Sequence, residues 1–539
     1  MQQHLISLLI FTPVLAAFVG LFLSSGASKA FRLLSLCASL LQLVYLVIIL
    51  NQYVPSAVNG MQFVEKHSWI TLHLGSWGIL KAEYFVGLDG LNLPLVALSV
   101  LIMLIATISS WTIEKNVKGY FILLLILNAA IIGSFTALDF LLFYLFFEFM
   151  LLPMFFLIAL WGGPRREYAS IKFFLYTLLG SILILIVLIG LYSSVHDPET
   201  SGPLVHTFNL LHMTDPVNFI SNSVLDPHNP WKIGPFDARR WAFLLLFFGF
   251  AIKLPMVPFH TWLPDAHVEA PTPVSVILAA LLLKIGGYGL ARIAFPVFPE
   301  AAMHFSFFIG LMGVISIIYG GLTAMASKDL KRLIAYSSVS HMGFVLLGLA
   351  SLTPEGVAGS VYQMVSHGIL SAMLFLLAGV LYDRTHDRTI GNYSGLSSRM
   401  QAYTAMVLVA FFASMGLPGF SGFIAEIMVF LGAFKSNSVN GLLHESLAII
   451  ATSGLVLGAA YYLWTLQRMF FGPFHLKGNI STSQITDLTR REYSMLVPLA
   501  VAALLFGIFP QPLLDFIDPF ARHLVELVSA NGKNITINP

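Results

Sequence analysis

Repeated runs of about 20 apolar residues constrain this chain most, because each run is long enough to cross the hydrocarbon core of a bilayer as a helix. Only 10% of the 539 residues are charged and 57% are hydrophobic, whereas soluble domains carry about 25% charged residues. The sequence therefore predicts an all-α, polytopic membrane protein of about 14 transmembrane helices. The expected spans lie near residues 4–24, 30–50, 86–110, 119–137, 139–160, 168–192, 241–259, 273–294, 303–325, 330–350, 357–382, 402–434, 446–470 and 493–512.

Two of these runs contain a break. The seventh reaches Lys253 and then meets Pro255 and Pro258, and the twelfth is too long for one plain helix and contains Pro418. Proline has no N–H, so it leaves a carbonyl without its helical partner. In hydrocarbon that carbonyl needs a neighbouring helix, a hydroxyl or water. We therefore expect broken seventh and twelfth helices, with a hydrated pocket beside Lys253.

The breaks also reveal a repeat. Spans four to eight and spans nine to thirteen each consist of three helices, a broken helix and a helix. A unit of five spans has an odd number of crossings, so successive units face opposite ways, and such inverted repeats are common in transporters. The expected parts are N-terminal helices 1–3 with an outer loop (1–118), a first repeat (119–294), a second, inverted repeat (303–470), and a cytoplasmic loop, last helix and outer C-terminal tail (471–539).

Lysine and arginine are distributed unevenly over alternate loops. The side reached after the first span collects 17 of the 28, the opposite side has 9, and Lys253 and Lys284 lie inside spans. Because cytoplasmic loops carry the excess of positive charge, the first side is predicted to be cytoplasmic and both termini to lie outside. The outer loops, about 51–85 and 193–240, show no convincing strand pattern, and we expect them to be surface caps.

Three charged side chains lie near the middle of spans in the first half. A lysine there costs about 2.5–3.5 kcal/mol on insertion scales, so Lys253 and Lys284 are hard to explain as structure alone. Glu148, in FLLFYLFFEFMLLPMFF, is either a protonated acid hydrogen-bonded in the bundle or a carboxylate paired with Lys253, and we favour the pair. Lys284 either snorkels to an interface or gains and releases protons, which its central position favours.

The second half supplies an acid and two histidines. Glu426 follows the break at Pro418 by eight residues, and we prefer a proton site on the exit side to a carboxyl near a helix end. His341 and His367 lie in the tenth and eleventh spans; histidine can relay protons near neutral pH, although each could equally be a hydrogen-bonded packing residue. Together with Glu148 and the two lysines, these groups could form a polar line parallel to the membrane.

Several classes of protein are disfavoured. The single cysteine, Cys37, rules out an internal disulfide and a four-cysteine iron–sulfur cluster held by this chain alone. Neither a phosphate-binding loop nor an HExxH zinc helix is present, and a net charge of +2 gives no reason to expect a nucleic-acid partner. Asp265, His267 and Glu269 have weak metal-ligand spacing, so we expect a solvated loop or the mouth of a proton-uptake path.

Five segments resemble the antiporter-like membrane subunits of respiratory complex I (NADH:quinone oxidoreductase), specifically the chain M, subunit-4 type. They are KLPMVPFHTWLPDAHVEAPTPVSVILAALLLKIGGYGLAR, FEFMLLPMFFLIALWGG, RLIAYSSVSHMGFVLLG, VYQMVSHGILSAMLFLLAGVLYDR and GLPGFSGFIAEIMVFLGAF. The resemblance extends from about residue 85 to 470. One departure from the family's pattern is SGLSSRMQAY at 394–403, in the loop before the twelfth span.

The resemblance implies a proton-translocating membrane-arm subunit, with each five-helix repeat forming a proton half-channel. It places the family's Glu–Lys pair on Glu148 and Lys253, its central lysine on Lys284, its twelfth-span acid on Glu426 and its relay histidines on His341 and His367. The acid at Glu426 favours the M type, because related subunits place a lysine there. No cofactor is expected in this chain; NADH, FMN, iron–sulfur clusters and quinone are expected in partner subunits, in a complex of the bacterial inner membrane.

Two other functions remain open. One is a subunit of a multi-subunit cation/proton antiporter, which shares these motifs and would exchange sodium for protons without NADH. The other is a non-pumping structural subunit of the membrane arm, which does not explain four charged side chains inside the membrane.

Overall fold

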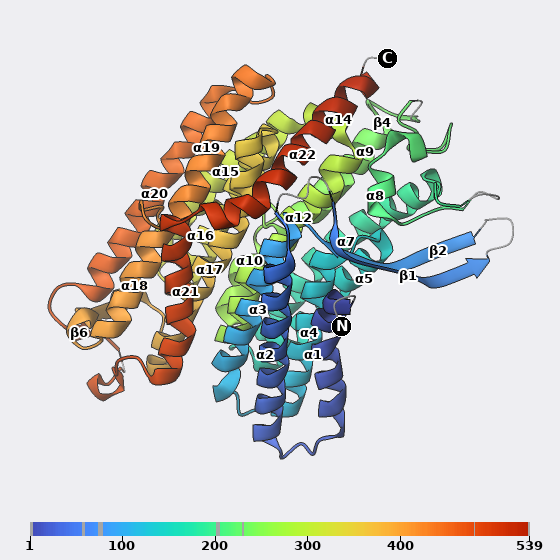
Figure 1. Ribbon diagram of the computed structural model, residues 1–539. Helices are drawn as coiled ribbons and strands as arrows, with labels where there is room; N and C mark the ends of the chain where they lie inside the picture. The colour runs from blue at the N-terminus through green and yellow to red at the C-terminus, as the bar shows by residue number, and fades with distance from the viewer. Residues whose placement is uncertain are drawn as a thin grey trace.

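The computed structural model describes residues 4–55, 60–73, 79–200, 205–228, 231–478 and 480–536. Long helices dominate it (Figure 1). The long helices and their continuations are α1 (Leu5–Phe22), α2 (Ser28–Gln52), α3 (Asn92–Ser109), α4 (Val117–Thr136), α5 (Phe140–Phe149), α6 (Leu151–Trp161), α7 (Arg166–Ser194), α9 (Ala238–Lys253), α11 (Thr272–Ile277), α12 (Leu283–Gly289), α13 (Phe295–Val297), α15 (Ser306–Ala326), α16 (Leu330–Ser351), α17 (Pro354–Thr385), α18 (Gln401–Ser414), α19 (Ser421–Val439), α20 (Glu445–Phe470), α21 (Arg490–Ile508) and α22 (Gln511–Thr536).

Short elements connect them. They are α8 (Leu210–Met213), α10 (Trp262–Glu269), α14 (Pro299–His304), and the strands β1 (Gln62–His73), β2 (Ile79–Leu88), β3 (Lys232–Ile233), β4 (Phe236–Asp237), β5 (Tyr393–Ser394) and β6 (His475–Leu476). The strands form three two-stranded antiparallel sheets, β1–β2, β3–β4 and β5–β6.

The expected membrane architecture is confirmed at the level of the bundle. Within the described residues, thirteen helices are long and apolar enough to cross a membrane, so the chain is a multi-pass integral membrane protein. The expected seventh span is shorter than predicted: α9 has only 16 residues, and residues 254–261 separate it from α10. The shortening follows from Lys253 and the two prolines, which end the helix where the sequence places them.

The twelfth span is also broken, between α18 and α19. Both breaks close in the same way. The N–H of Met256 bonds the carbonyl of Ala251 at 3.0 Å, and the N–H of Leu417 bonds the carbonyl of Phe412 at 3.1 Å. Each hydrogen bond joins residues five positions apart instead of four. The chain therefore forms a wider turn at the break, in which the carbonyl still accepts from a backbone N–H.

The first outer loop contradicts the expectation of a strand-free cap. β1 and β2 form an antiparallel hairpin in which Lys66 pairs with Phe85 and Ser68 with Glu83, and the hairpin projects from the side of the bundle in Figure 1. Its two strands present few alternating apolar residues, because both faces carry charged side chains. The period-2 pattern that would predict a strand is therefore weak in the sequence.

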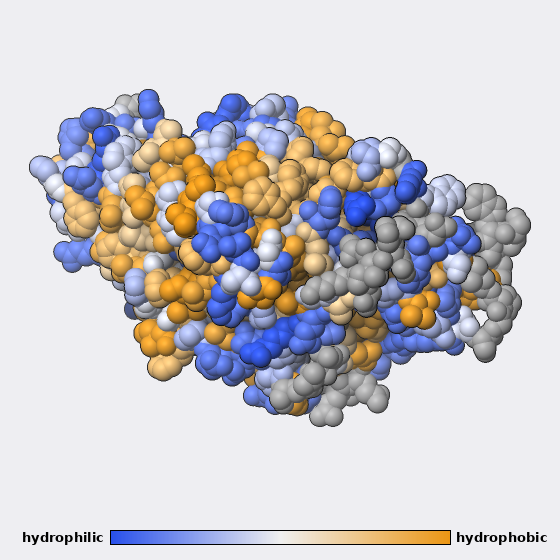
Figure 2. Space-filling model, turned by 90° about the horizontal axis from the view of Figure 1, so that it is seen from above, coloured by the Kyte–Doolittle hydropathy of each residue, from blue (hydrophilic) through white to orange (hydrophobic). Residues whose placement is uncertain are grey.

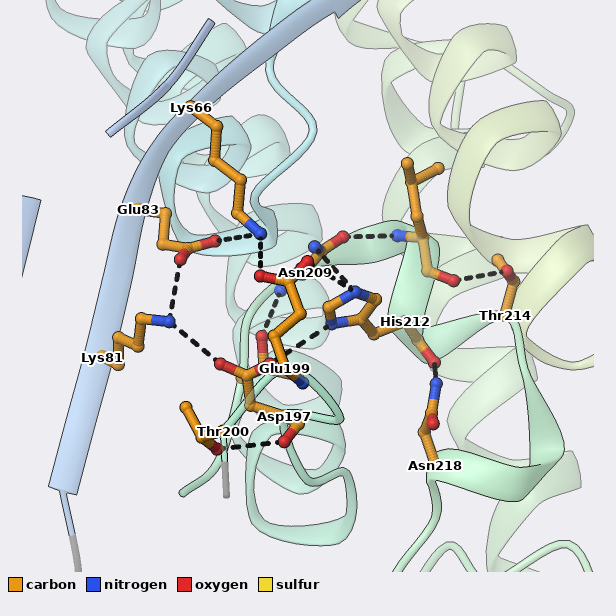
Figure 3. Close-up of polar contacts among 12 residues, drawn as sticks. Lys66, Lys81, Glu83, Asp197, Glu199, Thr200, Asn209, His212, Thr214 and Asn218 are labelled. Atoms are coloured by element: carbon orange, nitrogen blue, oxygen red, sulfur yellow. Dashed lines mark hydrogen bonds and ion pairs between the residues drawn. The ribbon is translucent and has the colours of Figure 1, made fainter. Parts of the chain in front are cut away.

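Charged side chains join this hairpin to the second outer loop (Figure 3). Lys66 lies 2.6 Å from Glu199, and Lys81 lies 2.9 Å from Asp197. Glu83 contacts both lysines, at 3.5 and 2.9 Å. We call this network, together with His212, the outer ionic cluster; it holds residues 195–200 and 205–219 against β2.

The C-terminal tail packs against the helical bundle. The described part of it forms the amphipathic helix α22, which packs against α14 and α17 and crosses the bundle towards the C-terminus in Figure 1. Gly90 makes room for it, since a Cβ there would lie 1.9 Å from the carbonyl oxygen of Phe516. Seen from above, the molecule shows hydrophilic patches among hydrophobic ones (Figure 2).

Candidate functional site

Lys284 lies on a helix whose hydrogen-bond register is widened on both sides. α12 is preceded by a π-helical turn, Leu278–Leu282, and followed by another, Leu290–Ala294. Lys284 is fully buried, and its Nζ donates to the carbonyl of Ala279 in the first π turn at 2.6 Å. π turns inside α-helices are frequent at functional sites, and here one supplies a partner for a buried ammonium.

The second partner of Lys284 comes from another helix. His367, on α17, places its Nδ1 2.6 Å from Lys284 Nζ, and both side chains are buried. When the lysine is an ammonium it has only donors, so Nδ1 accepts and the ring proton resides on Nε2. Of the residues predicted for the site, these two make the closest contact.

The contacts continue from His367 towards the twelfth span. The rings of His367 and His341 have centroids 5.4 Å apart. His341 Nδ1 lies 3.6 Å from the Glu426 carboxylate and 3.2 Å from the side-chain amide of Gln363. The structure therefore brings Lys284, His367, His341 and Glu426 into one line.

A small cavity accompanies this line. Its polar lining consists of Ser337, His341, Gln363, Ser366, His367, Ser371, Ser414, Glu426 and Tyr462. Glu426 Oε2 and the Ser414 hydroxyl are buried without a protein hydrogen-bond partner. A polar cavity with unpartnered oxygens is where an ordered water binds, so the histidines and Glu426 can exchange protons through water.

Glu148 and Lys253 are neighbours but form no ion pair within the part of the chain that the structure describes. Lys253, at the end of α9, lies 3.4 Å from the carbonyl of Phe147 and over the Phe147 ring, 3.3 Å from its centroid. The charge of Glu148 nevertheless acts on Lys253, and its Oε1 is buried without a hydrogen-bond partner. The geometry is that of a separated pair.

The hydrated pocket expected beside Lys253 is replaced in part by protein contacts. The carbonyl of Ala251 accepts from Met256, as described above, and the carbonyl of Ile252 accepts the indole N–H of Trp262 at 2.9 Å. Two carbonyls at the end of α9 thus find donors within the chain. The indole comes from α10, so the two halves of the broken helix are tied to each other across the break.

Asp265, His267 and Glu269 do not form the solvated loop that the sequence suggested. They lie on α10, and His267 is fully buried with its ring stacked on Phe375, 4.3 Å between centroids. Asp265 pairs instead with Lys172 at 2.8 Å. Among the described residues no group of three or more histidine, cysteine or acidic side chains could hold a metal ion.

Sequence reasoning missed Gln363 and Lys331 near the line, and it placed His267 in a solvated loop although this residue is buried. Both ring nitrogens of His267 are buried without a hydrogen-bond partner. The charge of Lys284 acts on this ring. Gln363 bonds His341, and Lys331, at the start of α16, is buried. Lys331 lies in the first turn of a span, where a lysine ordinarily reaches water, so its position gave no signal.

The comparisons with known proteins decide the family. The model of a family described as "NADH:quinone oxidoreductase/Mrp antiporter, TM" matches residues 137–452. The chain belongs to this family. It is similar over 97% of both chains to NADH-quinone oxidoreductase subunit M of Rhodobacter capsulatus, with 40% identity. It is 37% identical to NADH-ubiquinone oxidoreductase chain 4 of Arabidopsis thaliana, over 96% of both chains.

Solved structures agree in fold. A chain of respiratory complex I from Thermus thermophilus with bound NADH superposes with a TM-score of 0.79 and 28% identity, covering 98% of this chain and 100% of that one. A chain of the Mrp complex from Dietzia sp. DQ12-45-1b gives the same TM-score with 20% identity, covering 98% and 99%. Within the NADH:quinone oxidoreductase/Mrp antiporter family, the identities over full length join this chain to the subunit M, or chain 4, members.

Proposed function

We propose that this chain is a membrane-arm subunit of an NADH:quinone oxidoreductase, and that it moves protons across the membrane while quinone is reduced in partner subunits. The observation that carries the proposal is the line Lys284, His367, His341 and Glu426, in which all but the half-buried His341 are buried, with contacts of 2.6 and 3.6 Å at its two ends. Titratable groups are expensive inside a membrane and are retained where they do ion chemistry.

The line permits a stepwise transfer. The Lys284 ammonium gives its proton to His367 Nδ1, and His367 releases the proton on Nε2 through the cavity water to His341. His341 passes a proton to the Glu426 carboxylate, from which it leaves to the outer side. Each histidine ends the cycle neutral, because it receives one proton and gives one.

Lys253 drives this transfer electrostatically. When Glu148 is close, the charges of the pair cancel at a distance; when the pair separates, the Lys253 ammonium repels the proton on Lys284. Gly286 keeps the two helices close, since a Cβ there would lie 2.6 Å from the carbonyl oxygen of Phe250 and 2.7 Å from the backbone nitrogen of Leu254. Changes of charge at Glu148 can therefore be communicated to Lys284 without a large movement.

The remaining assignments follow the same proposal. Residues 119–294 and 303–470 form inverted half-channel units, each with its own broken helix, and the lysine- and arginine-rich side faces the cytoplasm of a bacterial inner membrane with both termini outside. NADH, FMN, iron–sulfur clusters and quinone belong to partner subunits, including related antiporter-like subunits. This chain contributes no redox centre.

One pair of measurements tests the proposal. Native membranes are extracted in mild detergent and run on a native gel, and the band that oxidises NADH is analysed by mass spectrometry for this chain. In inverted vesicles, Lys284→Met is expected to lower the number of protons moved per NADH oxidised, and His475→Leu, an exposed residue, to leave it unchanged. Sodium-for-proton exchange by a smaller assembly without NADH activity would identify a cation/proton antiporter instead.

A further inference from the structure

A polar cavity opens on the lysine- and arginine-rich side of the molecule, apart from the cavity of the histidine line. It lies between the ends of α3, α6 and α17 and the start of α16. Its charged lining consists of Glu269, Lys331, Asp383 and Arg388. Asp383 is exposed whereas Glu269 and Lys331 are buried, so the cavity leads from the surface into the bundle.

Lys331 is an unusual occupant of the inner end of this cavity. Its side chain is 2% exposed, and its Nζ donates to the carbonyl of Ala270 at 2.8 Å. None of the carboxylates in the described residues lies within 4 Å of it, while the charges of Arg388, Asp329, Asp383 and Glu269 act on it from farther away. An ammonium held by a neutral carbonyl, without a salt bridge, can give up its proton without breaking an ion pair.

The next titratable group inward is His267. It sits on α10, whose C-terminal cap is the same Ala270 that accepts from Lys331, and the charges of both Lys331 and Lys284 act on it. Its two ring nitrogens are buried without a hydrogen-bond partner. His267 therefore stands between the cavity and the start of the Lys284–His367 line.

We propose that this cavity is the water-filled entrance for protons and that Lys331 is the group that loads them into the relay. Hydrated protons in the cavity protonate the Lys331 amine, the ammonium transfers its proton to a nitrogen of His267, and His267 passes a proton to the Lys284 amine. Each donor returns to its starting form, so the net step moves one proton inward. The inference rests on the proposed function and adds to it the place and the side chain of uptake.

The test replaces the amine and then restores it chemically. In a Cys37→Ser background, Lys331→Cys is treated with 2-aminoethyl methanethiosulfonate; the thiolate attacks the reagent, methanesulfinate leaves, and an aminoethyl disulfide returns an amine to the cavity. Methyl methanethiosulfonate, which adds an uncharged group, is the matched reagent control. Lys328→Cys, an exposed position three residues earlier, is the matched position control.

The readout is protons moved per NADH oxidised in inverted vesicles, with the assembled complex quantified on a native gel. Lys331→Cys is expected to lose proton movement, the aminoethyl reagent to restore it, the methyl reagent not to do so, and Lys328→Cys to behave as the parent under every treatment. Full pumping by Lys331→Cys, restoration by both reagents, or restoration by neither would overturn the inference.

Two further variants keep the result interpretable. If Lys331→Cys does not assemble, Lys331→His is expected to pump with an efficiency that falls as the pH of the medium, which bathes the cytoplasmic side of inverted vesicles, rises through the range in which histidine loses its proton; a profile identical to that of the parent rejects the uptake role. Lys284→Met is measured alongside. If it keeps full pumping, the proposed function fails; if it loses pumping while the Lys331 variants keep theirs, only the uptake site is wrong.

Discussion

A short contact between Lys284 and His367 joins α12 to α17. The Nζ of Lys284 comes from α12, in the first half, and the Nδ1 of His367, 2.6 Å away, comes from α17, in the second. A proton that crosses this contact passes from α12 to α17. Removal of either side chain should therefore interrupt the path between the site of proton uptake and the site of proton release.

His367→Leu is expected to abolish most of the proton movement attributable to this subunit, because leucine cannot accept the Lys284 proton. General acid–base groups typically contribute about 10²–10⁴-fold to the rate of a proton transfer. The measurement is the initial rate of NADH-driven vesicle acidification at equal NADH oxidation. His475→Leu, exposed on β6, removes a histidine elsewhere, and equal loss in both variants would contradict the relay.

Glu426→Gln is expected to remove a carboxyl signal as well as activity. Glu426 Oε2 has no protein partner and Oε1 lies 3.6 Å from His341, so the acid can take and release a proton in its buried position. Infrared difference spectra of the complex during turnover should contain a carboxylic-acid C=O band that the glutamine variant lacks. An unchanged band assigns the signal to another acid and removes Glu426 from the path.

The sequence alone predicts titratable residues inside the spans, because charge inside an apolar run needs no tertiary information to be noticed. It could not predict the contacts among them. The contact of Lys284 with His367 depends on a π turn and on the packing of two helices, since the two residues are 83 positions apart in the sequence. Lys331 and His267 were missed as buried groups for the same reason, since their burial is created by the neighbouring helices.

The β1–β2 hairpin and α22 could not be predicted from the sequence for a different reason. Both lie at the bundle's edge, where strands with charged faces and an amphipathic terminal helix have lower hydropathy than a span. The breaks after Lys253 and around Pro418 were predictable, since proline acts locally. How their carbonyls are satisfied was not, because Trp262 reaches Ile252 from beyond the break.

Arg239→Met tests the outer end of the bundle. The guanidinium of Arg239 is buried, lies 2.5 Å from Glu300, and donates to the carbonyls of Leu225 and Val297. Removing it leaves the buried Glu300 carboxylate unpaired, so we expect a loss of about 3–5 kcal/mol in unfolding free energy. Denaturant titration in detergent measures this, and Arg239→Met combined with Glu300→Leu should recover most of the loss; additive losses would exclude the pairing.

Gly286→Ala should loosen the contact between α12 and the end of α9. A Cβ at Gly286 would lie 2.6 Å from the Phe250 carbonyl oxygen, so the helices must move apart, at an expected cost of about 1–3 kcal/mol. Coupling between Lys253 and Lys284 should weaken with it, seen as fewer protons per NADH. Gly391→Ala, with no atom within 4 Å of the new Cβ, serves as the control and should change neither quantity.

The outer ionic cluster should weaken in acid. Burial lowers the pKa of His212 below 6.5, despite Asp197 and Glu199 nearby, with Lys66 and Glu83 as the other charges that act on it. The unfolded loop then binds a proton more readily than the folded one, so the stability that is present above pH 6.5 falls as the pH drops through the folded pKa. The hydrogen bond from Lys66 likewise holds the pKa of Glu199 below 4.5, which adds a second loss at lower pH.

Amide hydrogen exchange of residues 62–72 and 205–219, corrected for the intrinsic pH dependence, measures this effect. His212→Asn should remove the step that begins near pH 6.5 and keep the one at lower pH, because Asn cannot titrate. Identical profiles for the parent and the variant would show that His212 does not govern the stability of the cluster.

Because two π turns flank Lys284, the number of residues in this helix determines which neighbour the lysine faces. A π turn accommodates one residue more than an α-helical turn of the same hydrogen-bonding role, and one residue corresponds to about 100° of rotation around a helix axis. Deleting a single residue between Leu278 and Leu282 would leave a smooth, fully bonded helix in which Lys284 faces a different neighbour. The helix would still cross the membrane, yet the Lys284 ammonium would no longer reach His367 on α17.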